Sequence, residues 1–367
     1  MKKIERGIKM LSNSNIIILL ALGVAFLLSF SSTPAIIALA HKLNAIDVPK
    51  DNRRIHKKPI PLMGGLAIFY GFVISLICFG VLDRETIGII LGCSIIILTG
   101  IFDDIKNIKP ITKLLFQLLA ASVVVCCGVR IEFLTNPLSN WIGSPQILLS
   151  PWMSISLTII WIVGICNAIN LIDGLDGLAV GVSTISAFCM LALTLISNDM
   201  NVAIIAASVA GAALGFLPYN FNPAKIFMGD TGSLFLGFVL ACISVQGLLK
   251  QSAVITFAVP VLILGLPIFD TAFAILRRIA SGKSPMSPDR GHLHHRLIDH
   301  GFSQKQAVAI LYTLTALLCF AAVVISIGGY TRGVFLILAV MFTIILSTIL
   351  MSKDLPTNKC QDNELRK

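Results

Sequence analysis

The stretch FMGDTGSLFLGF, residues 227–238, places one carboxylate, Asp230, at the start of a run of apolar side chains. This run continues to residue 248, and a helix that crosses the hydrocarbon core of a bilayer needs roughly 17 to 25 residues. A charged side chain at the mouth of such a span is costly, so it marks a candidate functional site. The stretch therefore predicts a membrane-spanning helix with a site at its beginning.

Apolar windows of similar length recur along the whole chain. Of the 367 residues, 56% are hydrophobic and 13% are charged, and the mean hydropathy is +0.91, far above that of a soluble protein. We therefore predict an all-α fold, a polytopic transmembrane helical bundle of about 10 or 11 spans. The chain is expected to form one integral-membrane domain, 1–351, followed by a short cytoplasmic tail, 352–367. The expected spans are 16–40, 64–82, 86–102, 111–129, 151–171, 178–197, 202–217, 231–248, 253–275, 306–326 and 332–351.

The Lys and Arg side chains are concentrated in alternate loops, and this pattern predicts which loops lie on which side of the membrane. The net charge is +10, and most Lys and Arg side chains fall in the tail and in the loops after the odd-numbered spans up to the ninth. The opposite loops contain only Arg84, Arg130, Lys250 and Arg332, and the basic N-terminus is the one feature against this assignment. Because cytoplasmic loops are enriched in Lys and Arg, the richer side is predicted to be cytoplasmic, in the cell membrane. The distribution argues against nucleic-acid binding, for which the charges would gather on one face.

Four further polar clusters share the character of the Asp230 stretch. They are DVPKDNRRIHKKPIPLMGG (47–65), FDDIKNIKPITK (102–113), NAINLIDGLDGL (167–178) and DRGHLHHRL (289–297). All fall on the predicted cytoplasmic side, so we expect the five clusters to form one active site there.

Asp103 and Asp104 end the third expected span, at the helix end that disfavours anions. Such a pair is a cation site, a proton acceptor, or simply a hydrated helix end. Lys113, at the start of the next apolar run, favours the first two interpretations, because it places a cation that can meet an anionic group beside the carboxylates.

The third cluster spaces its polar side chains three residues apart, at Asn167, Asn170, Asp173 and Asp176. On a helix they would follow one drifting face. Gly174 and Gly177 favour an opening of the helix here, which would free backbone N–H groups for a ligand. Non-helical backbone at membrane depth is tolerated where it lines a cavity or is buried in protein. A plain polar loop between two spans is the alternative.

The donor types indicate a hard metal ion. Oxygen ligands from Asp and Asn suit Mg²⁺, which often bridges to substrate phosphates, and no GxxxxGK[ST] phosphate loop is present.

The fifth cluster gathers His292, His294, His295 and Arg296, which suit pyrophosphate and sugar hydroxyls. Zinc, or a basic loop at the membrane surface, is the alternative there. The basic first cluster also suits anionic headgroups without catalysis.

Taken together, the clusters resemble the polyprenyl-phosphate N-acetylhexosamine-1-phosphate transferases. This family includes bacterial enzymes that begin the synthesis of teichoic acid or of lipopolysaccharide O-antigen. The motif order matches over residues 40–300. HLHHR looks like the sugar-selective loop of the N-acetylglucosamine branch, whereas the translocase that makes lipid I usually carries an uninterrupted HHH.

The resemblance implies a role for each matching residue. Asp230 and Asn170 would hold Mg²⁺, or Mn²⁺ in its place, and Asp103 would be the catalytic carboxylate with Asp104 beside it. Lys113 would contact the pyrophosphate, Asp173 and Asp176 would line the nucleotide pocket, and His292, His294, His295 and Arg296 would meet the sugar phosphate. The first lysine after the aspartate pair, Lys106, departs from the usual spacing, so it receives no role.

The implied reaction transfers N-acetylglucosamine 1-phosphate from UDP-N-acetylglucosamine to undecaprenyl phosphate, releasing UMP. Asp103 would either deprotonate the lipid phosphate or attack first. The partners are the two substrates and the bilayer, and a homodimer is left open. The alternatives are a phospho-MurNAc-pentapeptide transferase, a secondary transporter, for which matching broken helices would be expected, and a lipid-binding scaffold, which needs no triad of aspartates.

Overall fold

A computed structural model describes residues 2–49, 58–135, 146–248, 257–282 and 291–328. The expected span 332–351, the tail and most of the basic residues of the first cluster lie outside these ranges. The elements are α1 (Lys2–Lys42), β1 (Ile46–Asp47), β2 (Ile60–Pro61), α2 (Gly65–Phe79), α3 (Arg84–Lys106), α4 (Pro110–Cys126), β3 (Phe133–Thr135), β4 (Gln146–Leu148), α6 (Pro151–Ile172), α7 (Leu178–Ile196), α8 (Met200–Asn220), α9 (Gly229–Ile243), a π-helix (Ser244–Leu248), α10 (Ala258–Ile263), α11 (Gly265–Ala280), α12 (Leu293–Asp299) and α13 (Gln304–Gly328).

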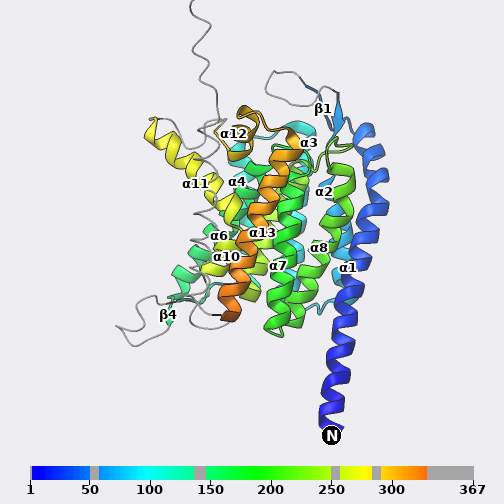
Figure 1. Cartoon of the computed structure of the whole chain (residues 1–367), viewed down its shortest axis with the longest axis vertical. Coiled ribbons are helices and arrows are strands. Elements are labelled where there is room, and N and C mark those ends of the chain that lie inside the picture. Colours follow the sequence, from blue (N-terminus) through cyan, green and yellow to red (C-terminus); the bar gives the residue numbers. More distant parts are fainter. Residues whose placement is uncertain (1, 50–57, 136–145, 249–256, 283–290, 329–367) are drawn as a thin grey trace, which may run out of the picture.

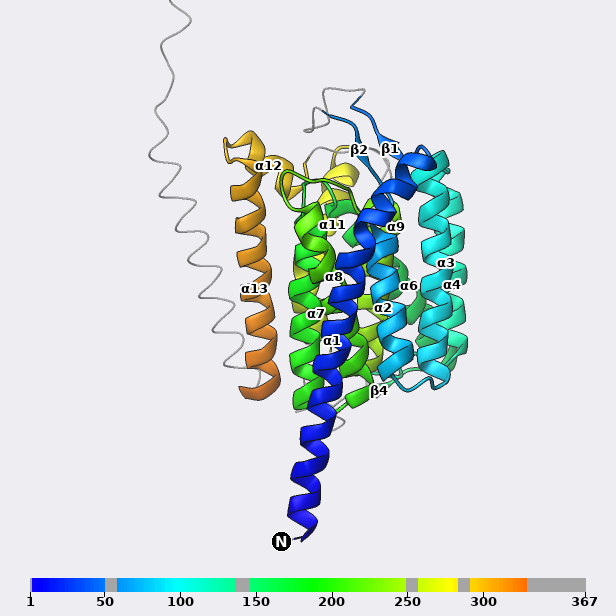
Figure 2. The ribbon, with the colours of Figure 1, turned by 90° about the vertical axis from the view of Figure 1, so that its right-hand side faces the viewer.

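The prediction of a polytopic helical bundle is confirmed. Within the described residues, seven helices are long and apolar enough to cross a membrane, namely α1, α3, α6, α7, α8, α13, and α9 with its π-helical extension. The shorter apolar helices α2 and α4 coincide with two further expected spans. Figures 1 and 2 show these helices side by side, with α1 along one edge and α13 on the opposite flank from α3 and α4.

The expected span 253–275 is not one continuous helix. Residues 249–256 lie outside the described ranges, and the remainder is divided at Leu264 into α10 and α11. Pro267 explains the break, because proline has no N–H to donate to the carbonyl of Ile263 four residues earlier. The hydroxyl of Ser186 donates to that carbonyl instead, over 2.9 Å. From this break α11 leans away from the bundle (Figure 1).

Helix α9 is the central element, and two glycines bring its first turn close to its neighbours. A Cβ at Gly65 of α2 would overlap the backbone of Gly232, and a Cβ at Gly100 of α3 would overlap the backbone of Thr231. Small residues at such crossings let helix backbones approach closely within a membrane. The beginning of α9 is therefore held between α2 and α3.

The short β1–β2 hairpin joins the first cluster to the segment before α9. Ile46 pairs with Pro61 and Asp47 with Ile60, and the N–H of Phe227 donates to the carbonyl of Pro61 over 2.8 Å. The N–H groups of Gly64 and Gly65 donate in turn to Phe227 and Met228. The hairpin thus fixes the backbone that leads into Asp230.

Candidate functional site

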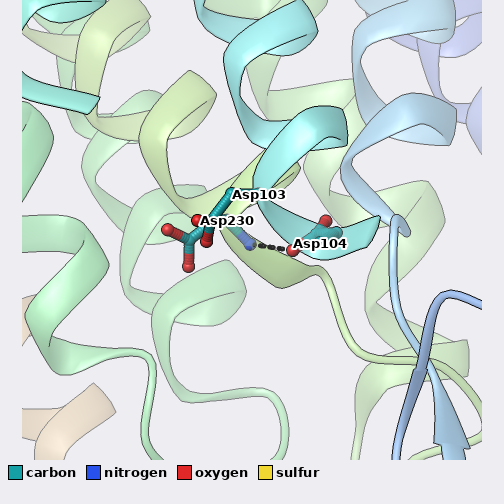
Figure 3. Close-up of side chains that lie close together, drawn as sticks. All are labelled: Asp103, Asp104 and Asp230. Carbon is teal, nitrogen blue, oxygen red and sulfur yellow. Dashed lines mark hydrogen bonds between the residues drawn. The ribbon is translucent and has the colours of Figure 1, made fainter. Parts of the chain in front are cut away.

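Three carboxylates from two helices meet where α3 ends and α9 begins (Figure 3). Asp103 and Asp104 lie in the last turn of α3 and Asp230 in the first turn of α9, and one oxygen of each lies within 4.8 Å of the others. Successive residues of an α-helix are rotated by about 100°, so the side chains of two adjacent aspartates leave the helix in different directions. Their hydrogen bonds show that they are used differently.

Asp104 binds the N-terminus of α9. Its Oδ1 accepts from the N–H of Asp230 over 2.9 Å. Its Oδ2 accepts from the N–H of Thr231 over 3.3 Å and from the Thr231 hydroxyl over 2.6 Å. The first N–H groups of a helix have no partner within the helix, and a carboxylate is favourable at that positive end. Asp104 therefore fixes the main chain that carries Asp230.

Asp103 and Asp230 share one lysine. Lys113, in the first turn of α4, places its Nζ 2.7 Å from Asp103 Oδ2 and 2.5 Å from Asp230 Oδ2. Asp103 is buried, and its other oxygen accepts from the N–H of Ile108 over 2.9 Å. The three carboxylates and the one ammonium leave the cluster with a net negative charge, so it retains an attraction for a further cation.

Asn170 reaches the same cluster from α6. Its Nδ2 donates to Asp230 Oδ1 over 3.1 Å and to the Ser233 hydroxyl over 2.8 Å. The amide nitrogen therefore faces Asp230, and the oxygen would face it only after a half-turn of the amide. Asn167 lies one turn earlier and is bound to Gln117 of α4 instead.

The helix does open at the two glycines of the third cluster, as predicted. α6 ends at Ile172 and α7 begins at Leu178, and Gly177 has a φ of +79°. Asp176 accepts from the Asn222 side chain and the Ala224 N–H, each over 3.0 Å, so it holds the loop after α8. Among the described residues, no hydrogen-bond donor reaches the Asp173 carboxyl. Burial raises the pKa of Asp173 to about 8, and the charges of Asp230, Asp104 and Asp176 add to that effect.

These groups line a cavity of about 470 Å³, a size typical of small-molecule sites. Each of the five polar clusters contributes to its wall. Six aspartates take part, and His295 is the one basic residue in the wall formed by the described residues. The lining residues are Asp47, Leu62, Asp103, Asp104, Asn107, Asn170, Asp173, Gly174, Leu175, Asp176, Asn220, Phe227, Gly229, Asp230, His295 and Gln304.

The residues of the histidine cluster have different surroundings. Only His295 lines the cavity. His294 is buried, and its ring packs so closely on Gly174 that a Cβ there would overlap it. Burial lowers the pKa of His294 to about 4, and the neighbouring His295 adds to this, so the ring is neutral at pH 7. His292 is buried against α11, and Arg296 is exposed and outside the cavity wall.

Asp270 and Gln304 are among the contributors to the site that the sequence did not indicate. Asp270 of α11 accepts from His292 Nδ1 over 2.8 Å, although it lies inside the expected span 253–275. The cost of a carboxylate at that depth was a signal that could have found it. Gln304, the first residue of α13, lines the cavity and accepts from the Asn222 side chain over 2.7 Å. No local pattern indicated Gln304, because the contact joins distant parts of the chain.

The donor set fits a hard divalent cation. Asp103, Asp104 and Asp230 offer carboxylate oxygens within 4.8 Å of one another, and carboxylates are the ligands that Mg²⁺ prefers. Asp104 already accepts three hydrogen bonds from α9. Asp103 and Asp230, which share Lys113, therefore supply the most available oxygens of the three.

The fold and the cavity define a class, a multi-pass membrane enzyme with an acidic site at one end of its helical bundle. Residues 86–248 match the model of glycosyl transferase family 4. The chain is 40% identical to a probable undecaprenyl-phosphate N-acetylglucosaminyl 1-phosphate transferase of Bacillus subtilis, with 89% of this chain and 90% of that protein covered. It is 34% identical to the decaprenyl-phosphate N-acetylglucosaminephosphotransferase of Mycolicibacterium smegmatis, with 88% and 86% covered. For the undecaprenyl-phosphate alpha-N-acetylglucosaminyl 1-phosphate transferase of Escherichia coli K12 the identity is 28%, with 76% of each chain covered. The chain belongs to glycosyl transferase family 4.

Proposed function

We propose that this protein transfers N-acetylglucosamine 1-phosphate from UDP-N-acetylglucosamine to undecaprenyl phosphate. The products are undecaprenyl-diphosphate-N-acetylglucosamine and UMP, and the step begins the synthesis of a cell-wall polymer such as teichoic acid or another surface glycan. The single observation that carries the proposal is the acidic cavity, to which all five polar clusters contribute. The chain that forms this cavity is similar to proteins named as sugar-phosphate transferases.

The charges of the reaction account for the composition of the site. A phosphate oxygen of the lipid attacks the phosphorus that bears the sugar, and the bond from this phosphorus to the oxygen that leaves with UMP breaks. Both substrates are anions, and the cavity is lined by six carboxylates, so cations must offset the repulsion. Mg²⁺, or Mn²⁺, held by the carboxylates of Asp103 and Asp230 and, after a half-turn of its amide, by the oxygen of Asn170 would supply that positive charge when present.

The chain's own groups would divide the remaining work. Lys113 would contact the pyrophosphate. Its ammonium lies between Asp103 and Asp230, so it would move partly away from these two carboxylates when the substrate binds. Asp173 and Asp176 would line the nucleotide pocket, and His295 would meet the sugar phosphate from the opposite wall. Asp103 would accept the proton of the lipid phosphate or attack first, and Asp104 would keep Asp230 in place.

The location follows from the charge distribution. The residues that line the cavity belong to clusters in or beside the loops predicted to be rich in lysine and arginine, so the active site would face the cytoplasm. The domain would comprise residues 1–351 with a cytoplasmic tail, and its partners would be the two substrates and the lipid bilayer.

A transfer assay with the purified protein tests the proposal. Detergent-solubilised protein would receive radiolabelled UDP-N-acetylglucosamine and undecaprenyl phosphate, with UDP-MurNAc-pentapeptide and other UDP-sugars as competing donors. We expect a labelled lipid product and UMP, activity that disappears with EDTA, and recovery with Mg²⁺. Product from the pentapeptide donor alone would identify the lipid I reaction instead, and the absence of transfer from every donor would contradict the proposal.

A further inference from the structure

Asp270, the aspartate that the sequence did not indicate, lies on a helix with an apolar, exposed face. The side chains of Phe269, Phe273 and Leu276 on α11 are exposed, as expected for a helix that faces lipid. Asp270 lies on the other face, and its side chain is only 7% exposed. A carboxylate placed in such a helix is expensive unless donors satisfy it.

Both oxygens of Asp270 are used by neighbouring residues of one loop. Oδ2 lies 2.8 Å from Nδ1 of His292, and Oδ1 accepts from the N–H of Leu293 over 2.8 Å. His292 is the N-cap residue of α12, so the two bonds fix both the first turn of that helix and the ring that precedes it. A histidine held through Nδ1 also has a defined tautomer and ring orientation.

The rings that follow His292 lead to the cavity. The ring of His294 stacks on that of His292, with centroids 5.8 Å apart and planes at 11°. The ring of His295 lies 4.3 Å from that of His294 and lines the cavity. On its far side His294 packs against Gly174, between the two aspartates of the third cluster. The array is thus held by Asp270 at His292, its first ring, and by the α6–α7 loop at His294, its middle ring.

We infer that Asp270 is a positioning residue, which orients His292 and the start of α12 so that His295 faces the nucleotide-sugar side of the cavity. This inference rests on the proposed function for its kinetic consequence. Asp270 itself does not line the cavity, so it acts through the histidines and does not touch the substrates.

Two substitutions separate the bonds that Asp270 makes. In Asp270→Asn the amide oxygen can still accept from the N–H of Leu293, but the NH₂ group then faces Nδ1 of His292 and requires the opposite tautomer. Asp270→Ala removes both bonds. Asp299→Asn is the matched control, because Asp299 is an exposed carboxylate at the other end of α12 and outside the cavity wall.

We expect a specific kinetic pattern in the transfer assay. The KM for UDP-N-acetylglucosamine should rise about tenfold in Asp270→Asn and by roughly tenfold to a hundredfold in Asp270→Ala, as for lost hydrogen bonds to a charged group. The KM for undecaprenyl phosphate should stay within about twofold in both. A general loss of folding would instead lower the amount of active enzyme and leave both KM values unchanged.

A second measurement does not depend on activity. In a His295→Cys protein whose native thiols are replaced, a water-soluble maleimide should modify the thiol at one rate in the parent and in the Asp299→Asn version. Asp270→Ala should change this rate at least about threefold, because the end of the array is released. If the wild type transfers nothing, the proposed function fails while this labelling still tests the positioning role. If both Asp270 variants match the control in labelling rate and KM, the inference is wrong.

Discussion

Asp104→Asn is the sharpest test of how the two adjacent aspartates are used. In the structure Asp104 accepts three hydrogen bonds from the first turn of α9, from the N–H groups of Asp230 and Thr231 and from the Thr231 hydroxyl. In Asp104→Asn, the oxygen of the new amide can still accept a hydrogen bond. The NH₂ group, however, faces an N–H or O–H group that itself donates, so the hydrogen bonds on that side are lost. The substitution also removes the negative charge from the positive end of the helix.

The magnitude follows from the bonds that are lost. A hydrogen bond to a charged group contributes about 1.5 to 3 kcal/mol, so the loss of two at the lower figure costs about 3 kcal/mol. If the whole of this loss raises the activation free energy, because Asp230 is no longer correctly placed in the transition state, kcat/KM falls about 150-fold. Thr231→Val removes a single one of the three bonds, so we expect it to lower kcat/KM by roughly tenfold to a hundredfold.

The assay is the transfer reaction, with thermal unfolding of the solubilised protein in parallel. Thr99→Val is the matched control, because the Thr99 hydroxyl lies in the same helix as Asp104 and donates only to Ile95, one turn earlier. The double variant of Asp104→Asn and Thr231→Val should lose less than the sum of the single losses. If Asp104→Asn is inactive while Thr231→Val behaves like Thr99→Val, Asp104 acts directly on substrate and our assignment is refuted.

Four further predictions address the remaining site residues. Lys113→Met should lower kcat at least about a hundredfold even at saturating Mg²⁺, because the buried Asp103 and the half-buried Asp230 lose their shared cation; near-normal turnover would contradict its contact with the pyrophosphate. Asp173→Asn should raise the melting temperature, and by more at pH 8 than at pH 5. The folded-state pKa of Asp173, about 8, exceeds the ordinary aspartate pKa of 3.8, so the wild type loses stability as the pH rises from 3.8 to 8; an equal gain at both pH values would contradict this. His295→Ala should lower kcat/KM for the nucleotide sugar about tenfold or more, whereas Arg296→Ala should stay within about twofold; equal losses would place Arg296 in the site. A cysteine at Asn107 should react with an impermeant thiol reagent only in inverted vesicles, and labelling of intact cells would reverse the proposed topology.

The bundle itself could be predicted from composition, because lipid-facing and core-facing side chains are both apolar and every span is a continuous apolar window. The convergence of the clusters could also be expected, since loops after odd-numbered spans return to the same side. The break at Leu264 was less visible. Pro260, Gly265 and Pro267 lie inside one apolar window, and hydropathy averages over the residues that interrupt the helix.

The division of labour within each cluster could not be predicted, because it depends on partners far along the chain. The histidines at 292, 294 and 295 are indistinguishable in sequence, yet one contacts α11, one packs on Gly174 and one lines the cavity. Likewise, Asn170 suggested an oxygen ligand, and only the packing of α6 on α9 shows that its amide nitrogen faces Asp230.

The geometry of a helix nevertheless imposes a rule on the adjacent aspartates. Because neighbouring residues are rotated by about 100°, the two carboxylates at the end of α3 leave the helix in different directions; both line the cavity, and one of them also contacts a packed neighbour. That neighbour is the start of α9, whose free N–H groups need an acceptor. Asp104 thus links the start of α9, which carries Asp230, to the last turn of α3, which carries Asp103. The distances of at most 4.8 Å between oxygens of the three carboxylates therefore depend on a contact between two helices that are far apart in the sequence.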